Sequence, residues 1–182
     1  MRILCFGDSN TYGYDPRGFG GDRYPAHSRW PDLLAQKTGF TIINAGMNGQ
    51  DIPSDDSIHR LLSRHNPVDS ILIMLGTNNL LQGDTAPETA RKMENFLSSL
   101  LPCRNPILLV APPPLKRGAW VDSDRLVDES RLLAEEYRLV SQRLEIPFLN
   151  TGSWEIPMAF DGVHLTEEGH RVFAENMYRS LP

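Results

Sequence analysis

Three residue types that together support nucleophilic acyl transfer occur near the two ends of this 182-residue chain. Ser9 follows a short apolar run that ends in Gly7 and Asp8, and Asp161 precedes His164 by three positions. A serine hydroxyl is a weak nucleophile until an imidazole accepts its proton, and a carboxylate can fix the orientation of that imidazole. The sequence therefore favours a serine hydrolase.

Each of these motifs alone also has a simpler explanation. Gly-Asp-Ser-Asn around Ser9 is a common turn composition. Asp161 and His164 at their spacing could be two metal ligands or a capped turn before a helix. A metal-dependent hydrolase that uses Asp8, Asp161 and His164 is therefore one alternative. A module of the same fold that binds a ligand without turning it over is another, although the intact set of Ser9, Asp161 and His164 argues against it.

Short apolar runs alternate with amphipathic segments along the chain, and these must position the three residues. The runs are residues 3–6, 41–44, 70–75, 107–111 and 147–149, and the helical patterns cover residues 30–37, 53–65, 87–101, 123–144 and 167–181. This alternation predicts an α/β fold with one parallel sheet and helices on both faces. Two loops rich in glycine or proline, residues 10–29 and 112–122, follow strands. Because ligands bind at the carboxyl ends of such strands, we expect the site there.

Two further segments place amide donors at the same edge. Residues 44–49 follow the second predicted strand, and residues 76–79 follow the third. The backbone N–H groups of Ser9 and Gly49 and the side-chain amide of Asn78 could together hold a developing oxyanion. Glycine at position 49 lets the backbone approach a substrate without a Cβ in the way. Each segment alone is typical of a turn, but together they favour a site.

The set of motifs resembles the four blocks of the SGNH hydrolases, also called GDSL esterases. The matching blocks are Gly7-Asp8-Ser9, Gly49, Gly76-x-Asn78 and Asp161-x-x-His164. The flanking segments are similar to the arylesterase and acyltransferase branch of that family. Two positions depart from the pattern: Asn10 stands where the name-giving motif has leucine, and Asn79 stands where many members have aspartate.

The resemblance implies a flavodoxin-like, three-layer α/β/α sandwich whose five-stranded parallel sheet has the order 2-1-3-4-5. It implies that Ser9 is the nucleophile, that His164 is the general base and then the general acid, and that Asp161 orients the imidazole. It also implies that Ser9, Gly49 and Asn78 form the oxyanion hole.

We therefore predict that the chain cleaves small carboxylic esters, of short-chain acids or aryl alcohols, through an acyl-enzyme and without a cofactor or metal. A carbohydrate acetylesterase and a lysophospholipase or thioesterase of the same fold are the alternatives. We expect the substrate pocket to be lined by Asp8, Trp30, Pro113, Leu115, Trp120, Phe160 and Val163. Trp30 has a second interpretation, because it could equally anchor the first long helix in the core.

Bulk properties limit the partners. The length predicts a single domain over residues 1–182, and a net charge of −5 argues against nucleic acid. No apolar stretch approaches the roughly 20 residues that span a bilayer. The apolar run at residues 3–6 is too short for a signal peptide, and Cys5 and Cys103 are expected to be buried thiols. We thus expect a cytoplasmic protein with a small-molecule substrate, and the proline loop at 112–114 is a candidate contact for a homo-oligomer.

Overall fold

A five-stranded parallel sheet forms the centre of the computed structural model, which describes residues 1–18, 22–54, 57–103 and 105–181. Its strands are β1 (Arg2–Gly7), β2 (Thr41–Gly46), β3 (Ser70–Met74), β4 (Ile107–Ala111) and β5 (Phe148–Asn150). They are arranged in the order β2-β1-β3-β4-β5, and neighbouring strands pair in parallel. The predicted fold class and strand order are therefore confirmed.

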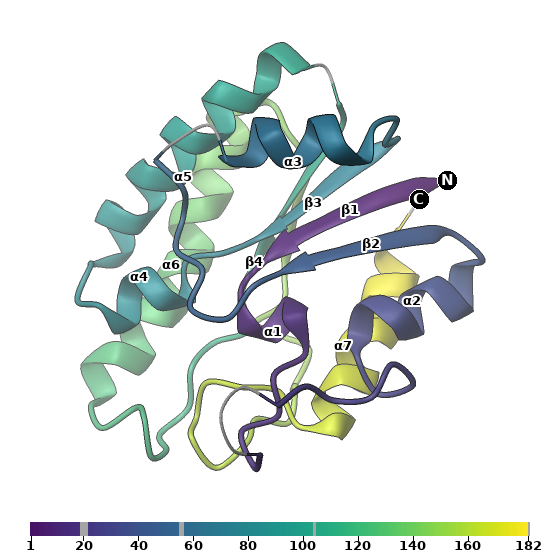
Figure 1. Cartoon of the computed structure of the whole chain (residues 1–182). Coiled ribbons are helices and arrows are strands. Elements are labelled where there is room, and N and C mark those ends of the chain that lie inside the picture. Colours follow the sequence, from purple (N-terminus) through teal and green to yellow (C-terminus); the bar gives the residue numbers. More distant parts are fainter. Residues whose placement is uncertain (19–21, 55–56, 104, 182) are drawn as a thin grey trace.

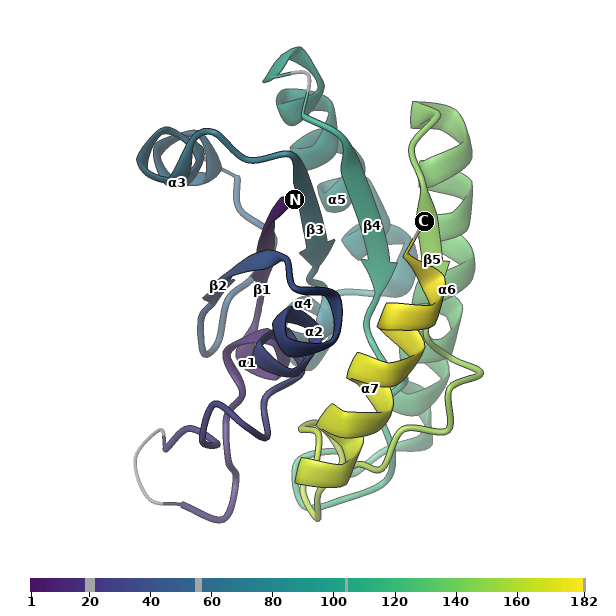
Figure 2. The ribbon, with the colours of Figure 1, turned by 90° about the vertical axis from the view of Figure 1, so that its right-hand side faces the viewer.

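Helices cover both faces of this sheet (Figure 1). They are α1 (Ser9–Tyr12), α2 (Trp30–Thr38), α3 (Ser57–His65), α4 (Thr77–Leu81), α5 (Ala86–Leu100), α6 (Asp124–Leu144) and α7 (Glu167–Ser180), with a short 3-10 turn, η1 (Leu101–Cys103). Figure 2 shows α2 and α7 side by side on one face, whereas α5 and α6 lie on the other. Part of the predicted helix at 53–65, residues 55 and 56, lies outside the described residues. No helix in the described ranges is long and apolar enough to cross a membrane.

Successive side chains of each strand point to opposite faces, so every strand contributes to two cores. In β1, Ile3 and Cys5 pack with Trp30 of α2 and with α7, whereas Leu4 and Phe6 pack with α5 and α6. Burial on both faces explains why the strands read as continuous apolar runs rather than as alternating patterns. The two cores hold the carboxyl ends of the strands in fixed positions, and the short helices α1 and α4 begin there.

The first of these short helices, α1, packs against a glycine of β2 and is capped by Asp8. Gly7 at the end of β1 lies opposite Gly46 of β2, and a Cβ at Gly46 would collide with the backbone nitrogen of Tyr12. The absence of a side chain therefore lets α1 pack directly on the end of β2. Asp8 caps α1, since its Oδ1 accepts the N–H of Asn10 at 2.9 Å. Ser9 is consequently the first residue of a helix at the carboxyl edge of the sheet.

Candidate active site

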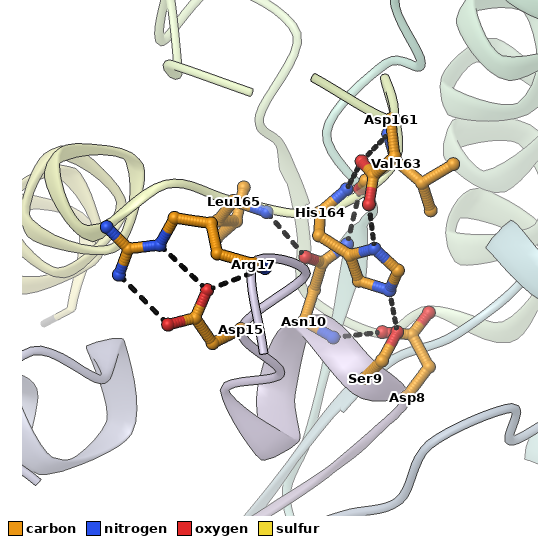
Figure 3. Close-up of polar contacts among 9 residues, drawn as sticks. All are labelled: Asp8, Ser9, Asn10, Asp15, Arg17, Asp161, Val163, His164 and Leu165. Carbon is orange, nitrogen blue, oxygen red and sulfur yellow. Dashed lines mark hydrogen bonds and ion pairs between the residues drawn. The ribbon is translucent and has the colours of Figure 1, made fainter. Parts of the chain in front are cut away.

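Ser9, His164 and Asp161 form a continuous hydrogen-bonded chain (Figure 3). The Oγ of Ser9 lies 2.9 Å from Nε2 of His164, although the two residues are 155 positions apart. The Nδ1 of His164 lies 2.6 Å from Oδ2 of Asp161. All three side chains are buried, and Ser9 keeps 7% of its surface exposed. The fold thus brings the predicted nucleophile, base and orienting acid together in that order.

The Asp161 carboxylate is held by its own loop. Its Oδ1 accepts the N–H groups of Val163 at 2.9 Å and His164 at 3.0 Å, and its Oδ2 faces the imidazole. Burial acts to raise the pKa of Asp161, but the hydrogen bonds from the His164 ring and from these two N–H groups outweigh it and hold the pKa below its ordinary value. An ionised Asp161 accepts a hydrogen bond from the N–H at Nδ1 of His164. The ring then carries its proton at Nδ1, so Nε2 is free to accept the hydroxyl proton of Ser9.

The predicted donors for an oxyanion lie around the same hydroxyl. Gly49 has φ +70°, a left-handed conformation, with open space where a Cβ would stand. Asn78 lies in the first turn of α4, and its Nδ2 donates one hydrogen bond to the carbonyl of Gln50 at 3.0 Å. That amide carries a second hydrogen, and Ser9 is at a helix start, where backbone N–H groups lack partners within the helix. The structure therefore brings Ser9, Gly49 and Asn78 together at one cavity.

This cavity has a volume of about 260 Å³ and opens over the serine. It is lined by Ser9, Tyr14, Asn48, Gly49, Asn78, Leu81, Trp120, Val163 and His164. Two rings face the imidazole of His164: the centroid of Tyr14 lies 4.6 Å away, and that of Trp120 lies 5.3 Å away. The walls are therefore partly aromatic, and the space suits a small substrate group.

Of the residues predicted to line the pocket, Trp120 and Val163 do so. Trp30 instead is fully buried in the core between the sheet and α7, with its ring 4.8 Å from that of Phe173. Its indole Nε1 donates to the carbonyl of Asn10 at 3.0 Å. The interpretation of Trp30 as an anchor of α2 therefore matches its position, and its placement in the pocket wall does not.

Four other residues predicted to line the pocket also lie elsewhere: Pro113, Leu115, Phe160 and Asp8. Pro113 borders a separate hollow. Leu115 is buried against Val163 and supports the wall from behind. Phe160 is 65% exposed, and its carbonyl accepts the N–H of Ala119, next to Trp120 in the chain.

Asp8 lies beneath the site rather than in its wall. The side chain is buried, and burial raises the pKa of Asp8 to about 6 against the lowering effects of the Asn10 N–H, the charge of His164 and the Thr77 hydroxyl. In the described part of the chain, no group of three or more His, Cys, Asp or Glu side chains is arranged to hold a metal ion.

Three lining residues, Tyr14, Asn48 and Leu81, were not among those predicted. Tyr14 belongs to the glycine-rich loop after Ser9, and its backbone N–H donates a hydrogen bond to the carbonyl of Ser9 at 3.0 Å. Leu81 stands three positions after Asn78 in α4, so the two share a helix face. A prediction of α4 would have revealed Leu81, but a helix of five residues leaves no periodic pattern.

Comparison with known proteins gives consistent matches along most of the chain. Residues 5–172 match the model of the GDSL-like lipase/acylhydrolase family. Among solved structures, the aryl esterase of M. smegmatis aligns with TM-score 0.87 and 27% identity over 98% of this chain and 96% of that one. A carbohydrate acetylesterase from Sinorhizobium meliloti aligns with TM-score 0.86 and 26% identity over 98% and 97% of the two chains. A putative arylesterase from Agrobacterium tumefaciens str. C58 aligns with TM-score 0.85 and 29% identity over 98% and 97%. A search of curated proteins finds no match.

Proposed function

The chain belongs to the GDSL-like lipase/acylhydrolase family and is a carboxylic ester hydrolase, and from this premise we propose that it cleaves small esters of short-chain acids through a Ser9–His164–Asp161 triad and an acyl-enzyme. The observation that carries the proposal is the chain of hydrogen bonds from Ser9 Oγ to His164 Nε2 and from His164 Nδ1 to Asp161 Oδ2, at 2.9 and 2.6 Å.

The proposed reaction uses this geometry. Ser9 Oγ attacks the ester carbonyl carbon while its proton passes to Nε2 of His164. The imidazolium, stabilised by Asp161, then gives that proton to the leaving alcohol as the tetrahedral intermediate collapses to the acyl-enzyme. A water molecule attacks the acyl-enzyme with His164 again as base, and the acid leaves as Ser9 recovers its proton.

The negative charge of the tetrahedral intermediate requires donors aimed at one point. The backbone N–H groups of Ser9 and Gly49 and the free hydrogen of the Asn78 amide are the groups we assign to this role. The bond from Asn78 to the carbonyl of Gln50 supports the assignment, because it fixes the direction of the amide before substrate arrives. Loss of one such donor typically lowers turnover by about 10²–10³-fold.

The cavity favours a small acyl group and a ring-bearing or ring-shaped alcohol. Its volume of about 260 Å³ suits an acetyl or similar acyl chain. Trp120 lines the cavity and is 54% exposed, so part of its ring is available to an aryl group or a sugar ring. The half-exposed indole keeps an acetylated carbohydrate as the second candidate substrate, and a carbohydrate acetylesterase is among the structural neighbours.

Hydrolysis of p-nitrophenyl acetate by the wild type and by Ser9→Ala tests the proposal. We expect a burst of p-nitrophenol in the wild type and a loss of about 10⁴-fold or more in Ser9→Ala. Ser98→Ala, which changes an exposed serine on α5, is the matched control and should keep full activity. Equal rates for the wild type and Ser9→Ala would remove Ser9 as the nucleophile.

The same assay separates the alternatives. A serine mechanism should survive treatment with a metal chelator, whereas a metal-dependent hydrolase should lose its activity. Comparing phenyl acetate with acetylated xylose decides between the two candidate alcohols by their kcat/KM values. A wild type that binds such esters but hydrolyses none would favour a non-catalytic binding module.

A further inference from the structure

The side chain of Asn10 connects the helix of the nucleophile to the loop of the base. Its Nδ2 donates to the carbonyl of Val163 at 3.0 Å, and its Oδ1 accepts the N–H of Leu165 at 3.0 Å. These two backbone groups lie on either side of His164, as Figure 3 shows. Asn10 is 3% exposed and Leu165 is fully buried. The amide therefore satisfies two backbone groups that would otherwise lack a partner in a buried place.

The pattern of these two bonds is that of a parallel β ladder. In such a ladder, one residue donates to the carbonyl before its partner and accepts from the N–H after it. The Asn10 amide does both, with His164 as the residue between. A side chain thus takes the place of one residue of a neighbouring strand, and the backbone on both sides of His164 is fixed.

The backbone of Asn10 is itself held in place by two hydrogen bonds. The N–H of Asn10 donates to Oδ1 of Asp8 at 2.9 Å, and its carbonyl accepts from Nε1 of the buried Trp30 at 3.0 Å. Asn10 is also the residue directly after Ser9 in α1. The two amide bonds therefore start from a rigid point next to the nucleophile.

The bonds within the His164 loop cannot replace this connection. Asp161 holds the N–H groups of Val163 and His164, but it lies three residues or fewer from both. Such local bonds shape the loop without setting its distance from Ser9. The Asn10 bonds join positions 153 and 155 residues apart, and so they connect the loop directly to α1.

We propose that Asn10 is a positioning residue, which sets the distance and orientation of the His164 imidazole relative to Ser9 Oγ. This inference rests on the proposed function, because it assigns a role within the same triad. Asn10 is not among the residues that line the cavity, and it acts through the backbone of Val163 and Leu165. Without it, the loop can shift by a fraction of an ångström to one ångström, and shifts of that size cost catalytic rate up to about 10²-fold.

Two variants of Asn10 test the proposal in the full-length protein. In Asn10→Ala both bonds are lost, and we expect kcat for p-nitrophenyl acetate to fall about 10–100-fold while KM changes less than about threefold. The rate of inactivation by a serine-directed phosphonate should fall by the same factor. Thr151→Val is the matched control, since it removes another buried hydrogen bond, from Thr151 Oγ1 to the carbonyl of Ala111 at 3.0 Å. It should lower the melting temperature and leave kcat unchanged.

Asn10→Asp gives a pH signature that a loss of packing would not produce. The new carboxylate can accept from Leu165 but cannot donate to the carbonyl of Val163 until it is protonated. The nearest titratable groups on the elements around it are the carboxylates of Asp8 and Asp161 and the imidazole of His164. We expect the ratio of kcat in Asn10→Asp to kcat in the wild type, measured at equal pH, to rise as pH falls. A flat ratio, or a kcat in Asn10→Ala within threefold of the wild type, would overturn the proposal.

Hydrogen exchange in the wild type supplies a test that does not depend on the folding of variants. The Leu165 N–H, bonded to Asn10 Oδ1, should exchange as slowly as the core amides of β1. Exchange at the rate of exposed loops would contradict the proposed connection. Failure of the proposed function is distinguishable, because it appears as full activity in Ser9→Ala, whereas failure of this inference appears as full activity in Asn10→Ala with Ser9→Ala inactive.

Discussion

The indole of Trp120 meets the imidazole of His164 edge to face, with 5.3 Å between ring centroids and 82° between ring planes. One side of the indole thus borders the imidazole, and 54% of the Trp120 residue remains exposed at the cavity rim. Aromatic contacts of this geometry are worth about 0.5–1.5 kcal/mol, and a ring near an imidazolium adds a comparable attraction. We therefore propose that Trp120 both contacts the imidazole of His164 and binds the alcohol group of the substrate.

Removal of this ring should reduce both catalysis and stability. We predict that Trp120→Ala lowers kcat/KM for phenyl acetate by about 2- to 30-fold, which corresponds to roughly 0.5–2 kcal/mol. The free energy of unfolding should fall by about 0.5–1.5 kcal/mol, because the contact with the His164 ring is lost. Phe160→Ala, at a more exposed aromatic residue outside the cavity lining, is the control. Equal effects of the two substitutions on kcat/KM would contradict a specific role for Trp120.

The three members of the proposed triad should differ in how much activity their replacement removes. His164→Ala removes the proposed base, and we expect almost no remaining activity. Asp161→Asn keeps an oxygen for the N–H groups of Val163 and His164, but it places an amide against Nδ1 at the former Oδ2 position. That amide favours the tautomer in which Nε2 carries the proton and cannot accept from Ser9. We predict that Asp161→Asn loses about 10⁴-fold in kcat and still exceeds His164→Ala. Full turnover by His164→Ala at neutral pH would show that the base is misassigned.

The parallel sheet was predictable because short apolar runs alternate with helical patterns along the chain, whereas its strand order was implied by the resemblance to the SGNH hydrolases. The strand β4 was predicted with its observed limits, and the end of β2 was predicted at residue 44 rather than Gly46. The short helices α1 and α4, with four and five residues, were not predictable, because they are held by caps and by strand ends rather than by periodicity.

The residues that line the cavity were predicted less well than the polar residues that the fold brings together. The types and order of Ser9, Asp161 and His164 identify a set that the fold brings within hydrogen-bond distance. The sequence around an aromatic residue such as Trp30 does not show whether its side chain points into the core or into the cavity. Its burial depends on Phe173 of α7, more than 140 positions later in the chain. Pocket lining depends on such packing between distant segments, and one sequence does not reveal it.

Asn79 departs from the aspartate found in many members of the family, and its neighbours explain why an amide suits this site. Its Oδ1 accepts the N–H of Ile52 at 3.1 Å, and its Nδ2 donates to Oδ2 of Asp84 at 3.2 Å. Asn79→Asp would set two carboxylates against each other beside Lys92, whose hydrogen bond already lowers the pKa of Asp84. We predict a loss of roughly 1–3 kcal/mol in the free energy of unfolding at pH 7.

A second substitution should recover part of the stability that Asn79→Asp loses. In the double variant Asn79→Asp with Asp84→Asn, one amide and one carboxylate face each other again, with their positions exchanged. Urea unfolding of the wild type, both single variants and the double variant gives the coupling energy between the two sites. We expect the double variant to be more stable than Asn79→Asp alone. Strict additivity of the two single effects would contradict this explanation of Asn79.

Asp8 should make stability depend on pH in the direction opposite to that of most carboxylates. Burial raises its pKa from 3.8 to about 6 in the folded protein, so between these values the native state holds a proton that the unfolded chain has released. Stability therefore falls as pH rises through this window and stays lower above it, by at most about 3 kcal/mol.

Asp8→Asn keeps a cap acceptor for α1 and removes the buried charge. We predict that it unfolds at higher urea concentration than the wild type at pH 8 and with little difference at pH 4. It should also turn over more slowly, because the imidazolium of His164 loses an attractive negative charge. Unfolding midpoints that differ by the same amount at pH 4 and pH 8 would contradict a buried, ionised Asp8.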